Sequence, residues 1–236
     1  MKKTVIIVAG GKGYRMGGDL PKQFIPFHGK PVLMRSIEAF YRWNTEAHIV
    51  VVIPVDHAEY WKMLCREMNF SVIHHLLYGG KTRFHSVQNG LFGVDADGLI
   101  AVHDGVRPFV SPDVISSCFK MAETHGSAIP VVPMIDSVRE IIRPTGNDEA
   151  PASPSAVNIQ NNIYEKYASR AIDRNRLCIV QTPQVFRADI LHKAYKQPYD
   201  ENFTDDATVV EASGFPIYLV EGNRENIKIT TSIDLK

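Results

Sequence analysis

The sequence has few cysteines and no long apolar run, and each of these features excludes a class of protein. The three cysteines, Cys65, Cys118 and Cys178, are far apart and form no C-x-x-C motif. An odd, scattered set of this kind indicates reduced thiols in a cytoplasmic protein rather than a disulfide framework. The apolar stretches are all shorter than the roughly 20 residues of a membrane span, so we expect no membrane association.

The chain also lacks net charge. Its 26 Lys and Arg residues balance 26 Asp and Glu residues, which gives a formal net charge of zero. A nucleic-acid-binding protein usually carries a basic excess, so we expect no nucleic-acid partner. A balanced total still permits a local phosphate site, because a few well-placed cations are enough to attract an anion.

Two common glycine-rich nucleotide motifs are missing from the N-terminus. The dinucleotide fingerprint G-x-G-x-x-G fails because Met16 stands where its third glycine belongs, and no Gly-Lys-Ser/Thr completes a Walker P-loop. Instead, an apolar run at 4–9 predicts a buried strand, and a loop rich in glycine follows it. Arg15 and Lys22 add positive charge to this loop, whose glycines allow backbone N–H groups to face an anion. We therefore predict the floor of a polyphosphate site here.

Strand-like and helix-like segments alternate along the rest of the chain. This alternation predicts one domain with an open, mainly parallel α/β sheet and helices on both faces. Ligands bind beyond the carboxyl ends of the strands in such sheets, where we expect the glycine loop, Gly79-Gly80 and Asp104. The expected strands are 48–54, 71–77, 99–103, 127–133, 178–180, 217–220 and 227–230, and the expected helices are 31–40, 56–69, 82–94, 188–195, 205–212 and one that is capped by Ser111, continues with Pro112 and ends near Gly126.

The pattern of alternation is interrupted between about 137 and 178. Residues 137–143 look extended, 144–155 are rich in proline and small residues, and 157–176 are polar with isolated apolar residues. Proline-rich segments of this kind do not form core elements, so we expect 144–155 to be a surface insertion. A long excursion from a compact domain usually has a function. We interpret 137–178 as an arm that projects from the sheet, with exchange between subunits as one candidate role.

Asp104 follows the predicted strand 99–103 in the segment V-H-D-G-V-R-P. A carboxylate at the end of a buried strand suits Mg²⁺, which takes one or two carboxylates together with phosphate oxygens and water. The ordinary alternative is an aspartate that caps a helix or a turn. The expected position of Asp104 at the same sheet edge as the glycine loop favours the magnesium site. We expect His103 either to pack in the core or to support a neighbouring site residue.

Two further polar residues have both an ordinary and a functional interpretation. Thr204 precedes the helix predicted at 205–212 and is a good N-cap, but a helix N-terminus also presents N–H groups to an anion. Lys228 alternates with Ile227 and Ile229, which predicts that the isoleucines face one side of a strand and the lysine the other. Lys228 then lies either in solvent or at a phosphate site.

A series of motifs runs through nearly the whole chain. In order, these motifs are A-G-G-x-G-x-R-M, P-K-Q, G-G-x-x-R-x-x-S-V, V-H-D-x-x-R-P, D-R-N, T-P-Q-x-F, T-D-D-A and E-G-x-x-x-N-I-K-I-T. The first resembles the signature of the sugar nucleotidyltransferases, and the full set resembles the 2-C-methyl-D-erythritol 4-phosphate cytidylyltransferase family of the non-mevalonate isoprenoid pathway. The resemblance implies a Rossmann-like fold of the nucleotide-diphospho-sugar transferase type. It also implies Mg²⁺-dependent transfer of a cytidylyl group from CTP to a polyol phosphate, with release of pyrophosphate.

The resemblance implies roles for individual residues. Arg15 and Lys22 are expected to stabilise charge at the α-phosphate, and Arg174 and Lys228 to position the attacking phosphate. Asp104 is the expected Mg²⁺ ligand and a substrate contact. In this family the arm exchanges between subunits, so the implied enzyme is a homodimer in which Arg174 reaches the partner subunit. The further expected contacts are Ala9, Gly10, Gly11, Gly80, Ser86 and Gly105 to the nucleotide, and Arg107, Asp136, Thr182 and Thr204 to the polyol phosphate.

The sequence departs from the family pattern at two places. The stretch before Arg174 is longer than the pattern, so that Arg170 and Arg176 compete for its role, although the spacing to Thr182 favours Arg174. Lys81 stands where an acidic or small residue is expected, so the nucleotide contact there rests on backbone atoms or is altered.

Two rival functions are open from the sequence. The ribitol 5-phosphate cytidylyltransferases share the first loop and an H-D-x-V-R-P-F segment, but the T-D-D-A, D-R-N and E-G-N segments favour the methylerythritol family. A non-catalytic nucleotide-binding module is expected to lose Lys22, Asp104 or Lys228 first, and all three are present.

Overall fold

The computed structural model describes residues 1–10, 20–142, 168–231 and 234. Gly11 and Arg15, two of the predicted site residues, and the predicted insertion 144–155 lie outside these ranges. The chain forms two compact units, one made of Met1–Val132 with Val180–Lys236 and the other of Pro133–Ile179. The smaller unit contains the segment predicted as an arm.

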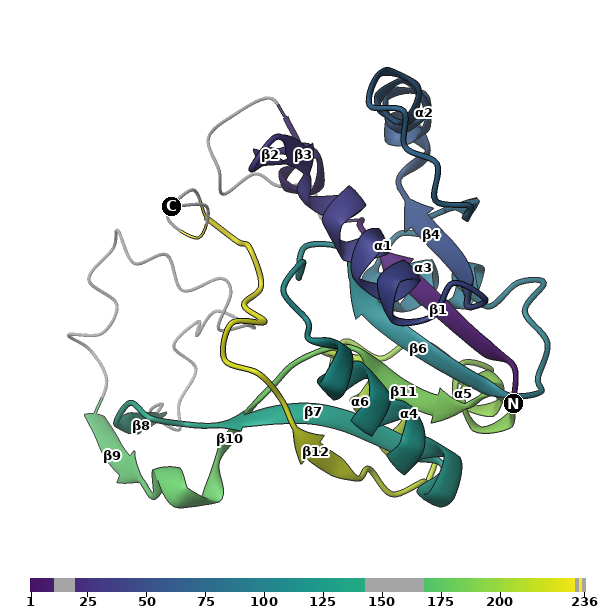
Figure 1. Ribbon diagram of the computed structural model, residues 1–236. Coiled ribbons are helices and arrows are strands. Elements are labelled where there is room, and N and C mark those ends of the chain that lie inside the picture. The colour runs from purple at the N-terminus through teal and green to yellow at the C-terminus, as the bar shows by residue number, and fades with distance from the viewer. Residues whose placement is uncertain (11–19, 143–167, 232–233, 235–236) are drawn as a thin grey trace. The chain divides into compact units, whose positions relative to one another are not determined.

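The larger unit is built on a mainly parallel sheet, as the alternation of segments predicted (Figure 1). Its strands lie in the order β7 (Ser127–Pro133), β11 (Gln184–Arg187), β6 (Leu99–Asp104), β1 (Lys3–Val8), β4 (His48–Ile53) and β5 (His75–Tyr78), and β12 (Leu219–Glu221) pairs with β7. β6, β1, β4 and β5 run parallel, whereas β11 is antiparallel to both β6 and β7. The register pairs Val8 with Asp104, so Ala9 and Gly10 follow β1 at the sheet edge where β6 ends.

Helices cover both faces of this sheet. One face carries α1 (Val32–Trp43), α2 (Ala58–Glu67) and α4 (Pro112–His125), and the other carries α3 (Arg83–Gly90), α5 (Ala188–Ala194) and α6 (Asp206–Ala212). Val5 and Ile7 of β1 pack into the first core, and Ile6 and Val8 pack into the second. Successive strand residues point to opposite faces, so the uninterrupted apolar run of β1 is what a strand buried on both faces requires.

Helix α4 begins and ends where its sequence predicts. The Ser111 side chain accepts a hydrogen bond from the Val114 N–H at 3.3 Å, and Pro112 occupies the first turn, where its missing N–H leaves no gap in the hydrogen bonding. Gly126 adopts a φ of 93°, the left-handed conformation that commonly ends a helix. Local chemistry therefore determines both ends of this helix.

Several predicted boundaries are wrong, and a short strand was missed. The predicted helix 56–69 is divided into the 3-10 turn η3 (Val55–His57) and α2, and the predicted strand 71–77 shortens and shifts to β5. The T-P-Q-x-F motif, where no strand was predicted, leads into β11. Because β11 has four residues with polar Gln184 and Arg187 at its ends, its sequence shows too few apolar positions for a recognisable period.

The predicted N-cap of α6 is also wrong. Asp205 rather than Thr204 caps this helix, because the Asp205 carboxylate accepts from the Thr208 N–H at 2.9 Å. The Thr208 hydroxyl in turn contacts the Asp205 backbone, which completes a capping box. A carboxylate is the stronger acceptor at the positive end of the helix dipole.

The smaller unit contains an antiparallel pair of strands. β8 (Val138–Ile142) pairs with β9 (Ala168–Ile172), which confirms the extended structure expected near 137–143. The 3-10 turn η7 (Arg174–Arg176) follows, capped by the side chain of Asp173, and β10 (Cys178–Val180) leads the chain back to the larger unit.

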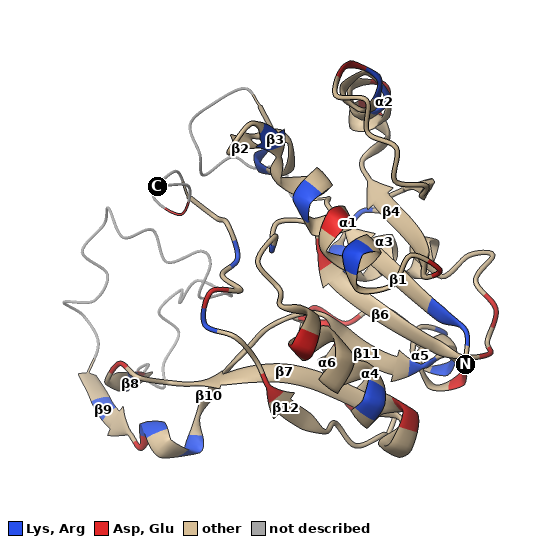
Figure 2. Ribbon diagram, viewed as in Figure 1, with Lys and Arg blue, Asp and Glu red and all other residues tan. Residues whose placement is uncertain are grey.

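Charged residues of both signs are interspersed on helices such as α2 and α4, while β7 carries none (Figure 2). Within the described ranges, no helix combines the length and the apolarity that crossing a membrane would take.

Replacing Ser111 with alanine removes the side-chain acceptor at the start of α4. We expect the free energy of unfolding to fall by about 1 kcal/mol, because the Val114 N–H loses its partner. Urea denaturation measures this loss. Ser117→Ala is the matched control, since Ser117 is exposed on the same helix and alanine is favourable inside a helix. An equal loss in both variants would contradict the capping role.

Candidate functional site

A pocket of about 700 Å³ opens at the carboxyl end of the sheet in the larger unit. β1 leads into Ala9 and Gly10 on its wall, and β6 ends there at Asp104. This is the edge at which parallel sheets bind ligands, as the sequence predicted. The predicted site residues that line the pocket are Ala9, Gly10, Lys22, Gly80, Ser86, Asp104 and Lys228.

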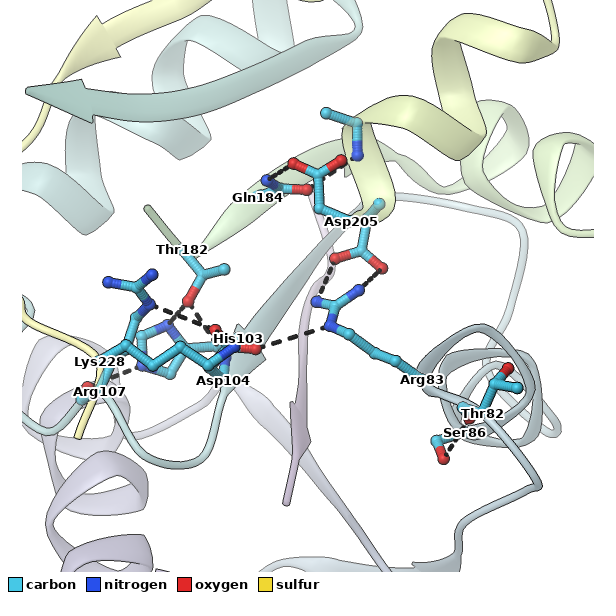
Figure 3. Close-up of polar contacts among 12 residues, drawn as sticks. Thr82, Arg83, Ser86, His103, Asp104, Arg107, Thr182, Gln184, Asp205 and Lys228 are labelled. Carbon is cyan, nitrogen blue, oxygen red and sulfur yellow. Dashed lines mark hydrogen bonds and ion pairs between the residues drawn. The ribbon is translucent and has the colours of Figure 1, made fainter. Parts of the chain in front are cut away.

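Asp104 is surrounded by positive charge (Figure 3). Its carboxylate is buried, and its Oδ2 lies 3.0 Å from Lys228 Nζ and 3.2 Å from Arg107 Nε. Its Oδ1 faces Arg83 Nε at 3.6 Å. These cations come from distant parts of the chain: Arg83 begins α3, Arg107 follows β6, and Lys228 belongs to the C-terminal segment.

The cations determine the charge state of Asp104. Burial by itself disfavours an ionised carboxylate and raises its pKa. Here the charges of Arg83, Lys228 and Arg107 outweigh burial and hold the pKa of the Asp104 carboxyl well below its usual range. Asp104 is therefore an anion at neutral pH, placed in the wall of a pocket lined by cations.

A buried hydrogen-bond chain fixes the backbone of Asp104. The Asp104 N–H donates to Thr182 Oγ1 at 3.1 Å, and Thr182 Oγ1 lies 3.0 Å from His103 Nδ1. His103 Nε2 lies 2.9 Å from the Arg107 carbonyl, which only accepts, so Nε2 carries the proton and Nδ1 accepts from the Thr182 hydroxyl. Burial lowers the pKa of His103 to about 4, which keeps it neutral. His103 is fully buried and also supports Asp104 through Thr182, so both roles expected of it are confirmed.

The segment that carries Lys228 is irregular rather than the predicted strand 227–230. The Ile229 N–H donates to the Val106 carbonyl at 2.9 Å, and Ile229 is fully buried, whereas Ile227 is exposed. The prediction that both isoleucines share one face is therefore wrong, because the segment passes over Val106 instead of pairing along a strand. The Lys228 side chain still reaches the pocket.

Asn226 ties this segment to its neighbours. Its Nδ2 donates to the Thr182 carbonyl at 2.8 Å, and its own carbonyl accepts from Arg107 at 2.8 Å. Asn226 is fully buried. The asparagine of the N-I-K-I-T motif thus helps to place Lys228 beside Asp104.

The start of α3 forms the opposite wall of the pocket. The Ser86 hydroxyl donates to the Thr82 carbonyl at 2.9 Å and accepts from the Gly80 N–H at 3.1 Å. A Cβ on Gly80 would lie 2.4 Å from the Cβ of His85, so a larger residue does not fit without moving the chain. The glycine at this position is therefore required by close packing as well as by any ligand contact.

Lys22 is held at the pocket by an aromatic cluster. It begins the 3-10 turn η2 (Lys22–Phe24), in which Phe24 is almost completely buried. The Phe24 ring stacks near Trp61 and meets Tyr60 edge-on, with centroids 6.2 and 5.3 Å away. Packing against α2 thus fixes the backbone that carries Lys22.

Sequence reasoning missed a cluster that involves Arg83. Its guanidinium makes two hydrogen bonds to Asp206, at 2.9 and 2.6 Å, and Asp206 accepts a further one from the Tyr195 hydroxyl at 2.6 Å. Arg83 and Asp206 both lie inside recognised motifs, G-G-x-x-R-x-x-S-V and T-D-D-A, but neither was assigned a role. Their presence in these motifs is the sequence signal that could have identified them as site residues.

Four other predicted site residues lie outside the pocket lining, although two of them, Arg107 and Thr182, contact Asp104. Gly105, Arg107, Thr182 and Thr204 belong to the larger unit but do not line the pocket. A Cβ on Gly105 would lie 2.9 Å from both Ala9 and Leu33 side-chain carbons, so packing explains this glycine.

The remaining two described site residues, Asp136 and Arg174, belong to the smaller unit. Both are exposed, and the Arg174 guanidinium donates to the Ile135 carbonyl within that unit.

Comparison with known proteins identifies the family to which this chain belongs. The family model of IspD, 2-C-methyl-D-erythritol 4-phosphate cytidylyltransferase, matches residues 3–236. The chain belongs to this family. It is 50% identical over 236 residues to the 2-C-methyl-D-erythritol 4-phosphate cytidylyltransferase of Phocaeicola vulgatus and 49% identical to that of Bacteroides thetaiotaomicron. In each case the match covers 100% of this chain and 97% of the relative.

Solved structures of the family have the same fold. The structure from Thermus thermophilus superimposes with a TM-score of 0.72 at 29% identity and covers 100% of this chain and 96% of its own. The structure from Francisella tularensis gives 0.74 at 29% identity, with 100% and 97% covered. The predicted Rossmann-like nucleotidyltransferase fold is confirmed, and so is the predicted class of enzyme, a cytidylyltransferase of isoprenoid biosynthesis.

Asp104→Asn removes the negative charge that three cations surround. We expect it to lower the free energy of unfolding at pH 7. The folded pKa of Asp104 is depressed, so its stabilising effect is complete above the unfolded value of about 4 and is lost as the pH falls towards the folded pKa. The difference between wild type and variant should be about 1 kcal/mol smaller at pH 3 than at pH 7.

Urea denaturation at the two pH values measures this difference. Asp97→Asn, at an exposed aspartate, is the control and should show little change. The same deficit for Asp104→Asn at both pH values would contradict the charge cluster.

Proposed function

We propose that the pocket beside Asp104 is where this chain transfers a cytidylyl group from CTP to 2-C-methyl-D-erythritol 4-phosphate. The observation that carries the proposal is the convergence of Lys22, Asp104 and Lys228, from distant segments, on one pocket. A triphosphate is strongly anionic, so cations and backbone N–H groups at glycines suit it. The family supplies the nucleotide and the acceptor.

The reaction is an in-line displacement at the α-phosphorus of CTP. A phosphate oxygen of the polyol phosphate forms the new P–O bond, the bond to the β-phosphate oxygen breaks, and pyrophosphate leaves with the electron pair. The attacking phosphate is already anionic, so no strong general base is needed. Catalysis then consists of positioning two anions and stabilising the charge that develops in the transition state.

The proposed residues fall into those that act on the nucleotide and those that act on the polyol phosphate. Lys22, with Arg15, stabilises charge at the α-phosphate, and Lys228, with Arg174, holds the attacking phosphate. Gly10, Gly80 and Ser86 line the pocket, which supports their proposed contacts to the nucleotide. The remaining proposed contacts are Ala9, Gly11 and Gly105 to the nucleotide, and Arg107, Asp136, Thr182 and Thr204 to the polyol phosphate.

We propose Mg²⁺ as the cofactor, with Asp104 as its protein ligand. Among the described residues, no three His, Cys, Asp or Glu side chains are grouped to hold a metal ion. The single carboxylate of Asp104 fits Mg²⁺, because this ion binds through one or two carboxylates and completes its shell with phosphate oxygens and water. When bound, Mg²⁺ neutralises phosphate charge and orients the triphosphate.

We further propose a cytoplasmic homodimer in which the 137–178 arm exchanges between subunits. The smaller unit exposes apolar side chains of a kind that a partner subunit would cover. These side chains are Ile135, Ile141, Ile142 and Ile179. Arg174 is exposed in the same unit and is available to a partner. The cysteines form no disulfide, which fits a reducing compartment.

Pyrophosphate release from CTP tests the proposed function. With Mg²⁺ present, we expect turnover with 2-C-methyl-D-erythritol 4-phosphate and little with ribitol 5-phosphate. Equal or faster turnover with ribitol 5-phosphate would contradict the acceptor. CTP binding without turnover on either acceptor would indicate a non-catalytic module.

Lys22→Ala and Lys228→Ala should each lower kcat by about 10²–10³, because each removes a preorganised cation from the reacting phosphates. Steady-state kinetics measure both losses, and Lys228→Ala should also raise the KM for the polyol phosphate. Lys120→Ala, at an exposed lysine on α4, is the control. Near-wild-type turnover in both pocket variants would count against the assignment.

Mixing two inactive variants tests whether Arg174 acts in the partner's site. A mixed dimer of Arg174→Ala and Lys228→Ala chains has one site with both residues intact. Equal amounts, allowed to exchange subunits, should recover about a quarter of wild-type activity, since half of the dimers are mixed. Sedimentation confirms that dimers form, and no recovery in mixed dimers means that both residues act within one chain.

A further inference from the structure

The two oxygens of Asp104 have different surroundings. Oδ2 is in contact with Lys228 and Arg107 at 3.0 and 3.2 Å. Oδ1 faces Arg83, whose Nε stays 3.6 Å away. A charge-assisted N–H···O bond is about 2.7–2.9 Å long, so Arg83 attracts the carboxylate without closing on it.

Arg83 is held in place from its other side. Its two terminal nitrogens donate to the two oxygens of Asp206 at 2.9 and 2.6 Å, in the forked geometry that makes such pairs strong. Asp206 is fully buried and also accepts from the Tyr195 hydroxyl. In Figure 3 the Arg83 side chain extends from α3 towards Asp104.

Asp206 is itself anchored, so it does not follow Arg83 if the arginine moves. It is the first residue of α6, directly after the Asp205 cap. Gln184 of β11 holds this helix start by donating to Asp205 at 2.7 Å and accepting from the Ala207 N–H at 2.8 Å. Tyr195 is fixed by stacking on Phe84, with ring centroids 4.8 Å apart.

A direct bond between Arg83 and Asp104 would change what Asp104 is able to bind. With Oδ2 already facing two cations, a guanidinium on Oδ1 would leave both carboxylate oxygens in contact with cations of the protein. It would also repel a divalent ion at short range. Metal binding therefore requires Arg83 to stay near Asp104 without bonding to Oδ1, as its distance of 3.6 Å allows.

We propose that Asp206 and Tyr195 are positioning residues that hold Arg83 back from Asp104 and so keep Oδ1 available to Mg²⁺. The inference rests on the proposed function, because it takes Asp104 as the Mg²⁺ ligand. It adds a role for the ion pair between Arg83 of α3 and the buried Asp206 of α6.

Mn²⁺, a paramagnetic substitute for Mg²⁺, provides a readout that does not depend on turnover. Electron paramagnetic resonance measures its binding to the protein saturated with CTP, without polyol phosphate. Asp206→Asn should weaken metal affinity by about 10-fold or more, because the released Arg83 closes on Oδ1. Tyr195→Phe keeps the stacked ring and should give a smaller loss. Tyr218→Phe, at a ring stacked on His125, should bind as wild type does.

Removing Arg83 in the same background separates this role from a merely structural one. Arg83→Gln added to Asp206→Asn removes the competing cation, so most of the lost metal affinity should return. In turnover assays of Asp206→Asn, the Mg²⁺ concentration for half-maximal rate should rise while kcat at saturating Mg²⁺ changes little. If Asp206→Asn does not fold, Tyr195→Phe with and without Arg83→Gln makes the same comparison.

Wild-type metal affinity in the folded variants, or a loss that Arg83→Gln does not recover, would overturn the inference while leaving the proposed reaction intact. If the wild-type protein with CTP binds no Mn²⁺ at all, the magnesium site of the proposed function fails, and the inference fails with it.

Discussion

The structure of the site depends on one buried carboxylate that stays ionised among cations. Arg83, Arg107 and Lys228 would repel one another without Asp104, and Asp104 would resist ionisation in its buried position without them. Asp104 therefore stays ionised because the cations are present, and its negative charge offsets their mutual repulsion. The cluster therefore holds fixed positive charge at a pocket wall, which a site for two phosphorylated substrates requires.

The fold brings these charges together by topology rather than by proximity along the chain. The parallel register of β1 and β6 places Ala9 and Gly10 at the same sheet edge as Asp104. Asn226 then ties the C-terminal segment to Thr182 and Arg107, and this brings Lys228 to the same edge. The start of α3 closes the opposite wall with Gly80 and Ser86. Segments from the beginning, middle and end of the chain thus share one pocket.

The sequence predicted what depends on local signals and on strand order. Ser111 and Gly126 identified both ends of α4, and Asp104 was recognised because it ends a buried strand. The sequence did not predict the bond between Arg83 and Asp206, which joins residues 123 positions apart. It also missed β11 and misplaced the α6 cap, since a short strand and the choice between neighbouring capping residues are decided by tertiary contacts.

A crystal structure of the protein with CTP and Mg²⁺ would show whether these charges serve one triphosphate site. We expect the triphosphate to lie in the 700 Å³ pocket against Lys22, with Asp104 in contact with the metal or the nucleotide and Arg83 still bonded to Asp206. A triphosphate bound away from this pocket, or an Asp104 carboxylate that contacts neither metal nor nucleotide, would contradict this arrangement.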